Sequence, residues 1–181
     1  MTKYYYDTGM FGYFLFRKDW DHQYSPTKVS GYISVFCEQE LINSCMNGHF
    51  KNWAEDWNFI DISESMMNIS ALFQPSDVKL SDVRAKFIHM MGTLTQNNID
   101  LYEDVKKHNK DKDSMPKPPD GMDWMHIAIA DLFKCDTVLT TDKDFKYLSK
   151  VGKFLKLESV KKIIVLSPDN KSNNVEEIIL Y

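Results

Sequence analysis

The segment from Asp123 to Phe145 constrains the fold more than any other part of the chain. It reads DWMHIAIADLFKCDTVLTTDKDF, an apolar helical run followed by an apolar and β-branched run that is typical of a buried strand. Asp123 stands at the start of the helix, and Asp142 and Asp144 follow the strand. A further acid, Asp7, follows an aromatic run near the N-terminus. Carboxylates therefore recur where strands and helices meet loops, which is where an α/β sheet builds its ligand site.

Four short segments rich in aromatic, apolar or β-branched residues are bounded by turn-forming residues, a pattern typical of strands. These segments are Lys3–Tyr6, Asn58–Ile62, Thr137–Thr141 and Ile163–Ser167. Helices are predicted over Phe11–Trp20 and Ser34–Met46, with Ser34 as the N-cap of the second. Strands that alternate with helices favour parallel pairing. We therefore expect an α/β fold with a parallel β-sheet of about four or five strands and helices on both faces.

The middle of the chain predicts two further helices and a loop. Apolar residues recur at helical spacing in two stripes, which we expect to be buried: Met66, Ile69, Leu72 and Phe73, with Ser63 as a candidate cap, and Leu80, Val83, Phe87, Met91 and Leu94. The stretch Asn109–Gly121 has three prolines and almost no apolar residues, which predicts an exposed loop. Residues 1–181 are expected to form one domain that includes this extended helical region and loop at about 74–121.

Composition limits the classes of function. A net charge of -4 argues against a protein that coats nucleic acid by bulk electrostatics, so any nucleic-acid binding must be local. The absence of an apolar run near the roughly 20 residues of a membrane span, and of a signal-peptide pattern, predicts a cytoplasmic protein with no membrane partner. Cys37, Cys45 and Cys135 are odd in number and widely spaced, which predicts buried reduced thiols rather than a disulfide framework or a zinc site.

The acidic residues predict a metal site. Parallel strands bring Asp7 and Asp142 to one edge of the sheet, and Asp123 in the first helical turn can face the same edge. Standing alone, Asp123 would equally fit a helix cap. Several carboxylates held together repel one another unless a divalent cation neutralises them, and oxygen ligands without a His or Cys cluster favour Mg²⁺ or Mn²⁺.

The helix over Ser34–Met46 offers one more carboxylate. Glu38 and Glu40 lie about 200° apart on a helical wheel, so only one of them can point into the site. Glu40 lies on the side of Phe36 and Cys37 and is the better candidate, whereas Glu38 is expected to be solvated.

Taken together, these motifs resemble the PIN-domain family of metal-dependent ribonucleases over about Lys3 to Pro168. The matching motifs are Asp7-Thr8 after the first strand, Ser34 and Glu40-Leu41 on the next helix, Asp123 before HIAIA, and TTDKDF. The resemblance implies that Asp7, Glu40, Asp123 and Asp142 form a catalytic, metal-binding quartet. It makes Asp144 an additional ligand or a residue that holds the loop, and Thr8, Ser34 and Thr140 supporting groups.

The resemblance also implies an activity and partners. Family members hydrolyse phosphodiester bonds, most often in RNA, with one or two Mg²⁺ or Mn²⁺ ions and a metal-activated water. Many small members are toxins of toxin–antitoxin pairs, often dimeric and covered by an antitoxin protein, although the longer middle region equally fits a stand-alone processing enzyme. The alternative is a PIN-like module that binds RNA or protein without cutting, but such modules usually lack one of the acids. An aspartic protease, suggested by Asp7-Thr8-Gly9, would require a β-rich fold.

Other side chains are candidates for substrate contact. The segment Lys143–Lys162 has seven lysines against two acids, and Lys143, Lys146, Lys150 and Lys153 could contact the RNA backbone, although a solvated helix face fits equally. Trp53 and Trp57 could stack on bases or pack against a helix. His126 follows Asp123 by three residues and is either a partner of the acids or a satisfied, partly buried histidine.

Overall fold

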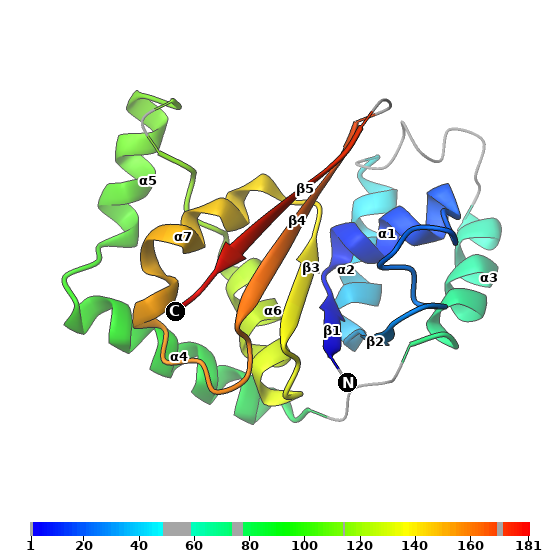
Figure 1. Ribbon diagram of the computed structural model, residues 1–181, viewed down its shortest axis with the longest axis horizontal. Coiled ribbons are helices and arrows are strands. Elements are labelled where there is room, and N and C mark those ends of the chain that lie inside the picture. The colour runs from blue at the N-terminus through cyan, green and yellow to red at the C-terminus, as the bar shows by residue number, and fades with distance from the viewer. Residues whose placement is uncertain (1, 49–58, 74–77, 114, 170–171) are drawn as a thin grey trace.

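The computed structural model describes residues 2–48, 59–73, 78–113, 115–169 and 172–181 (Figure 1). Its strands are β1 (Lys3–Tyr6), β2 (Ser30–Tyr32), β3 (Thr137–Thr140), β4 (Lys162–Asp169) and β5 (Ser172–Ile179). Its α-helices are α1 (Thr8–Arg17), α2 (Val35–Met46), α3 (Phe59–Ser70), α4 (Leu80–Gln96), α5 (Leu101–Lys110), α6 (Gly121–Leu132) and the short α7 (Leu148–Val151). Two 3₁₀ helices, η1 (Lys143–Tyr147) and η2 (Gly152–Phe154), flank α7.

The strands form one sheet in the order β2-β1-β3-β4-β5. β2, β1, β3 and β4 pair in parallel, with Tyr5 opposite Val138 and Tyr6 opposite Leu139. β5 returns antiparallel along β4 and was not predicted. The expected α/β class is confirmed, and the expected parallel sheet is correct for its first four strands.

Helices cover both faces of the sheet, as the alternation of side chains along β1 shows. The Tyr5 ring faces α6, where it lies 5.8 Å from the ring of His126. The next residue, Tyr6, faces the opposite side and packs against Phe14 of α1 and Phe73 after α3. Successive strand residues point to opposite faces, so these two adjacent aromatic residues pack against two different helical layers. Figure 1 shows the helices on the two sides of the sheet.

Two predictions around the second strand were wrong. The second strand is Ser30–Tyr32, a segment too short and too polar to stand out in the sequence. The predicted strand Asn58–Ile62 begins outside the described residues, and from Phe59 it belongs to α3. Ile62 is buried four residues before Met66, so the helical stripe starts earlier than predicted, and Ser63 lies inside the helix rather than at its cap.

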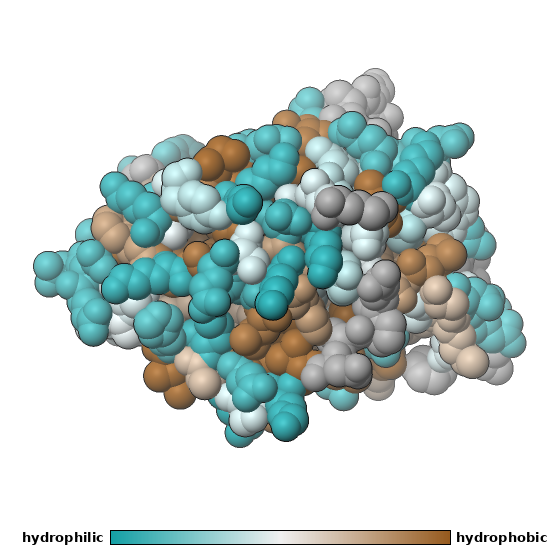
Figure 2. All heavy atoms as spheres, turned by 60° about the horizontal axis from the view of Figure 1, so that its bottom comes forward, coloured by the Kyte–Doolittle hydropathy of each residue, from teal (hydrophilic) through white to brown (hydrophobic). Residues whose placement is uncertain are grey.

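Most residues of the helical stripes are buried, but Phe87 and Met91 are only half-buried and two further positions are exposed. Leu72 and Leu80, predicted to be core, are 43% and 41% exposed because they lie beyond the end of α3 and at the first turn of α4. Figure 2, with the lower edge of Figure 1 turned forward, shows hydrophobic side chains in small groups among hydrophilic ones. Within the described part of the chain, none of the helices combines the length and the apolar character needed to cross a membrane.

The loop and the thiols agree with expectation in part. The connection between α5 and α6 is irregular, but Pro118 and Pro119 are buried rather than exposed, and the indole Nε1 of Trp124 donates to the Pro119 carbonyl at 3.0 Å. The three cysteines are free thiols; Cys37 and Cys135 are buried, whereas Cys45 is half-buried. Trp53 and Trp57 lie outside the described residues.

Candidate active site

A cleft of about 840 Å³ opens beside the carboxyl ends of β1 and β3. From β1 the chain passes through α1 to β2 on one side, whereas β3 leads to β4 on the other side. This is a topological switch point, where the two connections diverge and leave a crevice in which open α/β sheets bind ligands.

The cleft brings together the four acids predicted from sequence. They come from four different places: Asp7 from the end of β1, Glu40 from α2, Asp123 from the first turn of α6 and Asp142 from the turn after β3. The other lining residues are Thr8, Gly9, Phe36, Gln39, Asn43, Ser44, Asn47, Met122, His126, Thr141 and Lys143.

Asp7 lies at the floor of the cleft and is only 4% exposed. It caps α1, because its Oδ1 accepts the backbone N–H of Met10 at 2.8 Å, so that this helix begins three residues earlier than predicted. Its Oδ2 accepts the Thr140 hydroxyl. The lack of a side chain at Gly9 leaves room for the Thr141 hydroxyl, with which a Cβ at this position would collide. Burial raises the pKa of Asp7 from its ordinary value of 3.8 to about 6, although the hydrogen bond from Thr140 lowers it.

Asp123 combines the two roles that its position suggested. It is the third residue of α6, and its carboxylate accepts the Asp120 N–H at 2.9 Å while Asp120 accepts the Asp123 N–H, which completes a capping box. The same side chain lines the cleft. Burial, together with the charges of Asp120, Asp142 and Asp7, raises the pKa of Asp123 from its ordinary value of 3.8 to about 7, although the backbone hydrogen bond from Asp120 lowers it.

Asp142 and Asp144 have different surroundings. The backbone N–H of Asp142 donates to the Thr140 hydroxyl at 2.9 Å, so Thr140 links Asp142 to Asp7. Burial raises the pKa of Asp142. Asp144 does not line the cleft, and its carboxylate pairs with Lys117 of the loop before α6 at 2.7 Å. This geometry favours the interpretation in which Asp144 holds the loop.

Glu40 is fixed by two donors on the same oxygen. Its Oε2 lies 2.7 Å from Nε2 of His126 and also accepts the Thr8 hydroxyl. Burial acts to raise the pKa of Glu40, but His126 and Thr8 more than offset it, so the pKa is lowered and the side chain stays charged. Glu38 faces away from the cleft as expected, yet it is half-buried and accepts the Ser70 hydroxyl of α3 at 2.7 Å instead of being solvated.

His126 is a buried partner of the acids, which unites the two interpretations of the sequence. It is 2% exposed, and its Nδ1 lies 2.8 Å from the hydroxyl of Tyr5. Burial disfavours the imidazolium, but Cys37 and Glu40 raise the pKa of His126 well above its ordinary value. Ser34 occupies the N-cap position of α2 without a side-chain capping bond; its hydroxyl contacts that of Tyr5 at 2.9 Å.

The predicted lysines are spread apart by the fold. Lys143 lines the cleft. Lys146 pairs with Glu176, and Lys150 pairs with Asp104 at 2.7 Å. Lys153 lies 5.0 Å from the centre of the Phe154 ring.

Sequence reasoning missed the wall that α2 contributes. Several residues that line the cleft recur at spacings of three or four and so share one face of α2. They are Phe36, Gln39, Glu40, Asn43 and, at the C-cap, Asn47. This polar stripe at helical spacing was a readable signal. Its amide groups supply neutral donors and acceptors along one side of the cleft.

The donor set has the chemistry that Mg²⁺ or Mn²⁺ prefers. Asp7, Asp123 and Asp142 all have raised pKa values, first because they are buried and then because neighbouring acids repel their charged forms, and a divalent cation would offset both effects. Across the described ranges, however, no three His, Cys, Asp or Glu side chains are already grouped closely enough to hold an ion together. The residues fit a hard cation by their chemistry, with Asp7, Asp123 and Asp142 as its best holders.

Comparison of the chain with models of known protein families, with curated proteins and with solved structures finds no match.

Proposed function

We propose that this protein is a Mg²⁺- or Mn²⁺-dependent endoribonuclease of PIN type. The observation that carries the proposal is the convergence of Asp7, Glu40, Asp123 and Asp142 on one cleft at the switch point of the sheet. These acids lie up to 135 residues apart in sequence, since Asp7 and Asp142 bracket the set. Raised pKa values at a cleft support a chemical role rather than a purely structural one.

The side chains divide the work of hydrolysis. When bound, a divalent cation lowers the pKa of a water and neutralises charge on a phosphate. Asp7, Asp123 and Asp142 supply anionic oxygens for that cation, while Thr140 and the capping box hold two of them in place. Glu40, kept ionised by His126, can supply a further oxygen for the cation and is the candidate for accepting a proton from the attacking water.

The open cleft suits a polymeric substrate. Lys143 can contact phosphate, and the amides of Gln39, Asn43 and Asn47 can contact sugar or base edges along the α2 wall. An antitoxin protein that covers the cleft, and a homodimer, remain part of the proposal as partners that the family resemblance implies.

The test is cleavage of a mixed pool of labelled RNAs with Mn²⁺, Mg²⁺ or EDTA. We expect cutting with either metal and none in EDTA, and a loss of about 100-fold or more in Asp7→Asn, Asp123→Asn and Glu40→Gln. Glu38→Gln is the matched control for Glu40→Gln, because both glutamates are on α2 but Glu38 faces Ser70. Cutting that survives EDTA, or that survives either aspartate substitution, would refute the metal mechanism.

A non-catalytic RNA- or protein-binding module is the second candidate. One observation favours it: no three potential ligands among the described residues are already grouped around one point. RNA that binds in the same assay but is not cut with either metal would make this candidate the better one.

A further inference from the structure

A chain of hydrogen bonds runs from Glu40 into the core behind the cleft. Nε2 of His126 lies 2.7 Å from the carboxylate of Glu40, and Nδ1 of the same ring lies 2.8 Å from the Tyr5 hydroxyl. The Tyr5 hydroxyl in turn lies 2.9 Å from the Ser34 hydroxyl and 3.4 Å from the Cys37 thiol. Both ring nitrogens of His126 are therefore engaged, one toward the cleft and one toward the core.

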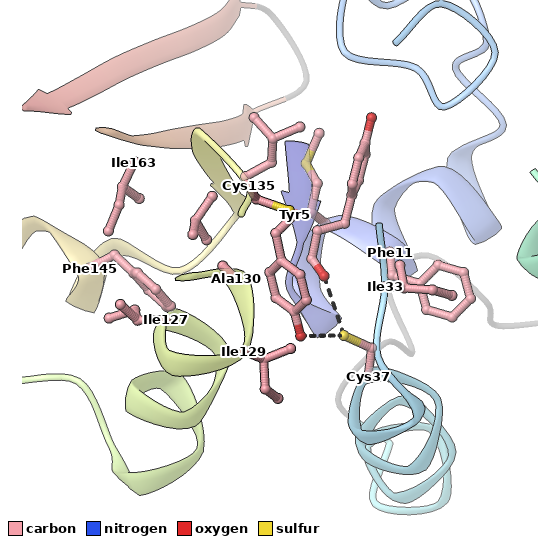
Figure 3. Close-up of a cluster of buried hydrophobic side chains, with 14 of the residues drawn as sticks. Tyr5, Phe11, Ile33, Cys37, Ile127, Ile129, Ala130, Cys135, Phe145 and Ile163 are labelled. Atoms are coloured by element: carbon pink, nitrogen blue, oxygen red, sulfur yellow. Dashed lines mark hydrogen bonds between the residues drawn. The ribbon is translucent and has the colours of Figure 1, made fainter. Parts of the chain in front are cut away.

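The inner members of this chain are shielded from water. Tyr5 and Cys37 are fully buried, and Ser34 is 3% exposed. Figure 3 shows the Tyr5 ring beside Ile129 and Ala130 of α6, with its hydroxyl directed at Cys37 of α2. A phenylalanine would fill the same apolar space, so packing alone does not explain a hydroxyl at this position.

The donors have a consistent direction. A carboxylate can only accept, so Nε2 of His126 must carry the proton that it shares with Glu40. Because the pKa of His126 is raised, the ring is an imidazolium whose Nδ1 also carries a proton and donates to the Tyr5 hydroxyl, and Tyr5 can in turn donate to Ser34. Each group thereby fixes the orientation of the next, from Ser34 through Tyr5 and His126 to Glu40.

We propose that Tyr5 and His126 are positioning residues that hold the Glu40 carboxylate toward the cleft, with Ser34 as their anchor. The proposal rests on the proposed function for the use of Glu40, but it concerns residues that do not themselves meet substrate. Residues that are hydrogen-bonded to the ligands of a metal site orient those ligands. Loss of such a residue typically lowers metal affinity or activity about 10–100-fold.

The chain offers a matched pair of variants. Tyr5→Phe removes the hydroxyl that contacts His126, whereas Tyr6→Phe removes a neighbouring hydroxyl that donates to the Tyr24 carbonyl at 2.5 Å on the other face of the sheet. Both side chains are fully buried, and each variant removes only a hydroxyl: that of Tyr5 contacts His126, Ser34 and Cys37, whereas that of Tyr6 donates to Tyr24. We expect Tyr5→Phe to weaken Mn²⁺ binding, measured by titration calorimetry, about 10-fold, and Tyr6→Phe to change it less than about 2-fold.

A second comparison tests whether Tyr5 acts through Glu40. In a Glu40→Gln background, Tyr5→Phe should have little further effect on Mn²⁺ affinity, because interacting residues are not additive. Equal losses from Tyr5→Phe in both backgrounds, or equal losses from Tyr5→Phe and Tyr6→Phe, would overturn the proposal.

A measurement on the metal-free protein separates this proposal from the proposed function. The ¹⁵N NMR signals of the His126 ring and the ¹³C signal of the Glu40 carboxylate should both move in Tyr5→Phe and stay in place in Tyr6→Phe. Signals that do not move in Tyr5→Phe overturn the positioning role even if the protein cuts RNA. A wild-type chain that binds neither Mn²⁺ nor Mg²⁺ refutes the nuclease, while moving signals still support the positioning of Glu40.

Discussion

At the scale of single residues, the cleft holds acids in two opposite electrostatic states. Asp7 and Asp123 have raised pKa values because burial and neighbouring acids disfavour their charged forms. Glu40 has a lowered pKa because His126 and Thr8 offset its burial. Carboxylates whose pKa values are pushed apart are a usual sign of divided roles in a hydrolytic site.

The raised pKa values predict how the stability of the metal-free protein depends on pH. The folded state binds the protons of Asp7 and Asp123 more tightly than the unfolded state does, so their contribution is present below about pH 4 and is lost as pH rises through about 6 to 7. In EDTA, we compare the free energy of unfolding of Asp123→Asn with that of the wild type at pH 5 and at pH 8. The difference should shift in favour of the variant by about 1–3 kcal/mol when the pH is raised from 5 to 8.

Urea unfolding at the two pH values measures this difference. Asp113→Asn, on the exposed loop, serves as the control and should show no such gain. The prediction would be contradicted if the free energies of unfolding of the wild type and Asp123→Asn differed by the same amount at both pH values.

At the scale of elements, a buried carboxylate near the end of α6 joins parts of the chain that are distant in sequence. Asp131 accepts the backbone N–H groups of Glu158, Ser159 and Val160 on the approach to β4. It also pairs with Lys86 of α4 at 2.5 Å. This contact docks α4 against α6 and so supports the helix that carries Asp123 and His126.

Removal of Lys86 should therefore destabilise the fold. In Lys86→Met the Asp131 carboxylate stays buried and keeps its backbone donors but loses its cation, which should lower the free energy of unfolding by about 2–4 kcal/mol. Lys106→Met removes a lysine whose pairing with Glu103 is exposed and screened by solvent, so it should lower the free energy of unfolding much less than Lys86→Met does. Similar losses in the two variants, measured by chemical denaturation, would contradict the structural role of Asp131.

At the scale of the whole molecule, the fold decides which charges face the cleft. The lysine-rich stretch of the sequence suggested one basic surface, but Lys146 and Lys150 are engaged by Glu176 and Asp104. Lys143 lines the cleft. With a net charge of -4, RNA binding would have to depend on such local contacts.

The salt dependence of RNA binding tests this arrangement. Lys143→Ala should weaken binding and reduce the slope of log affinity against log salt by about 0.7, the value for one phosphate contact on a single strand. Lys150→Ala should leave the slope unchanged, because Lys150 is committed to Asp104. If Lys150→Ala reduces the slope and Lys143→Ala does not, the lysine-rich stretch, rather than the cleft, would be the surface that binds RNA.

Local sequence patterns were enough to predict the α/β class, three of the parallel strands, most of the apolar helical stripes and the four acids of the cleft. These features are local: propensity, periodicity and the residue that follows a strand are readable without tertiary contacts. The sequence did not determine β2, whose three residues have little intrinsic preference and become a strand by pairing with β1. The antiparallel return of β5 along β4 likewise went unpredicted.

The surroundings of each acid depend on contacts that form only in the folded chain. Spacing along the chain cannot show that Asp144 pairs with Lys117 or that Glu40 is hydrogen-bonded to His126. Nor can it show that the Ser34 hydroxyl contacts Tyr5 instead of capping α2. Such partnerships depend on which side chains remain unpaired when distant elements are buried together, because a buried polar group must find a partner wherever the fold provides one. The segment Asp123–Phe145 indicated where the site would lie, and the packing of β1, α2 and α6 around it set the chemistry.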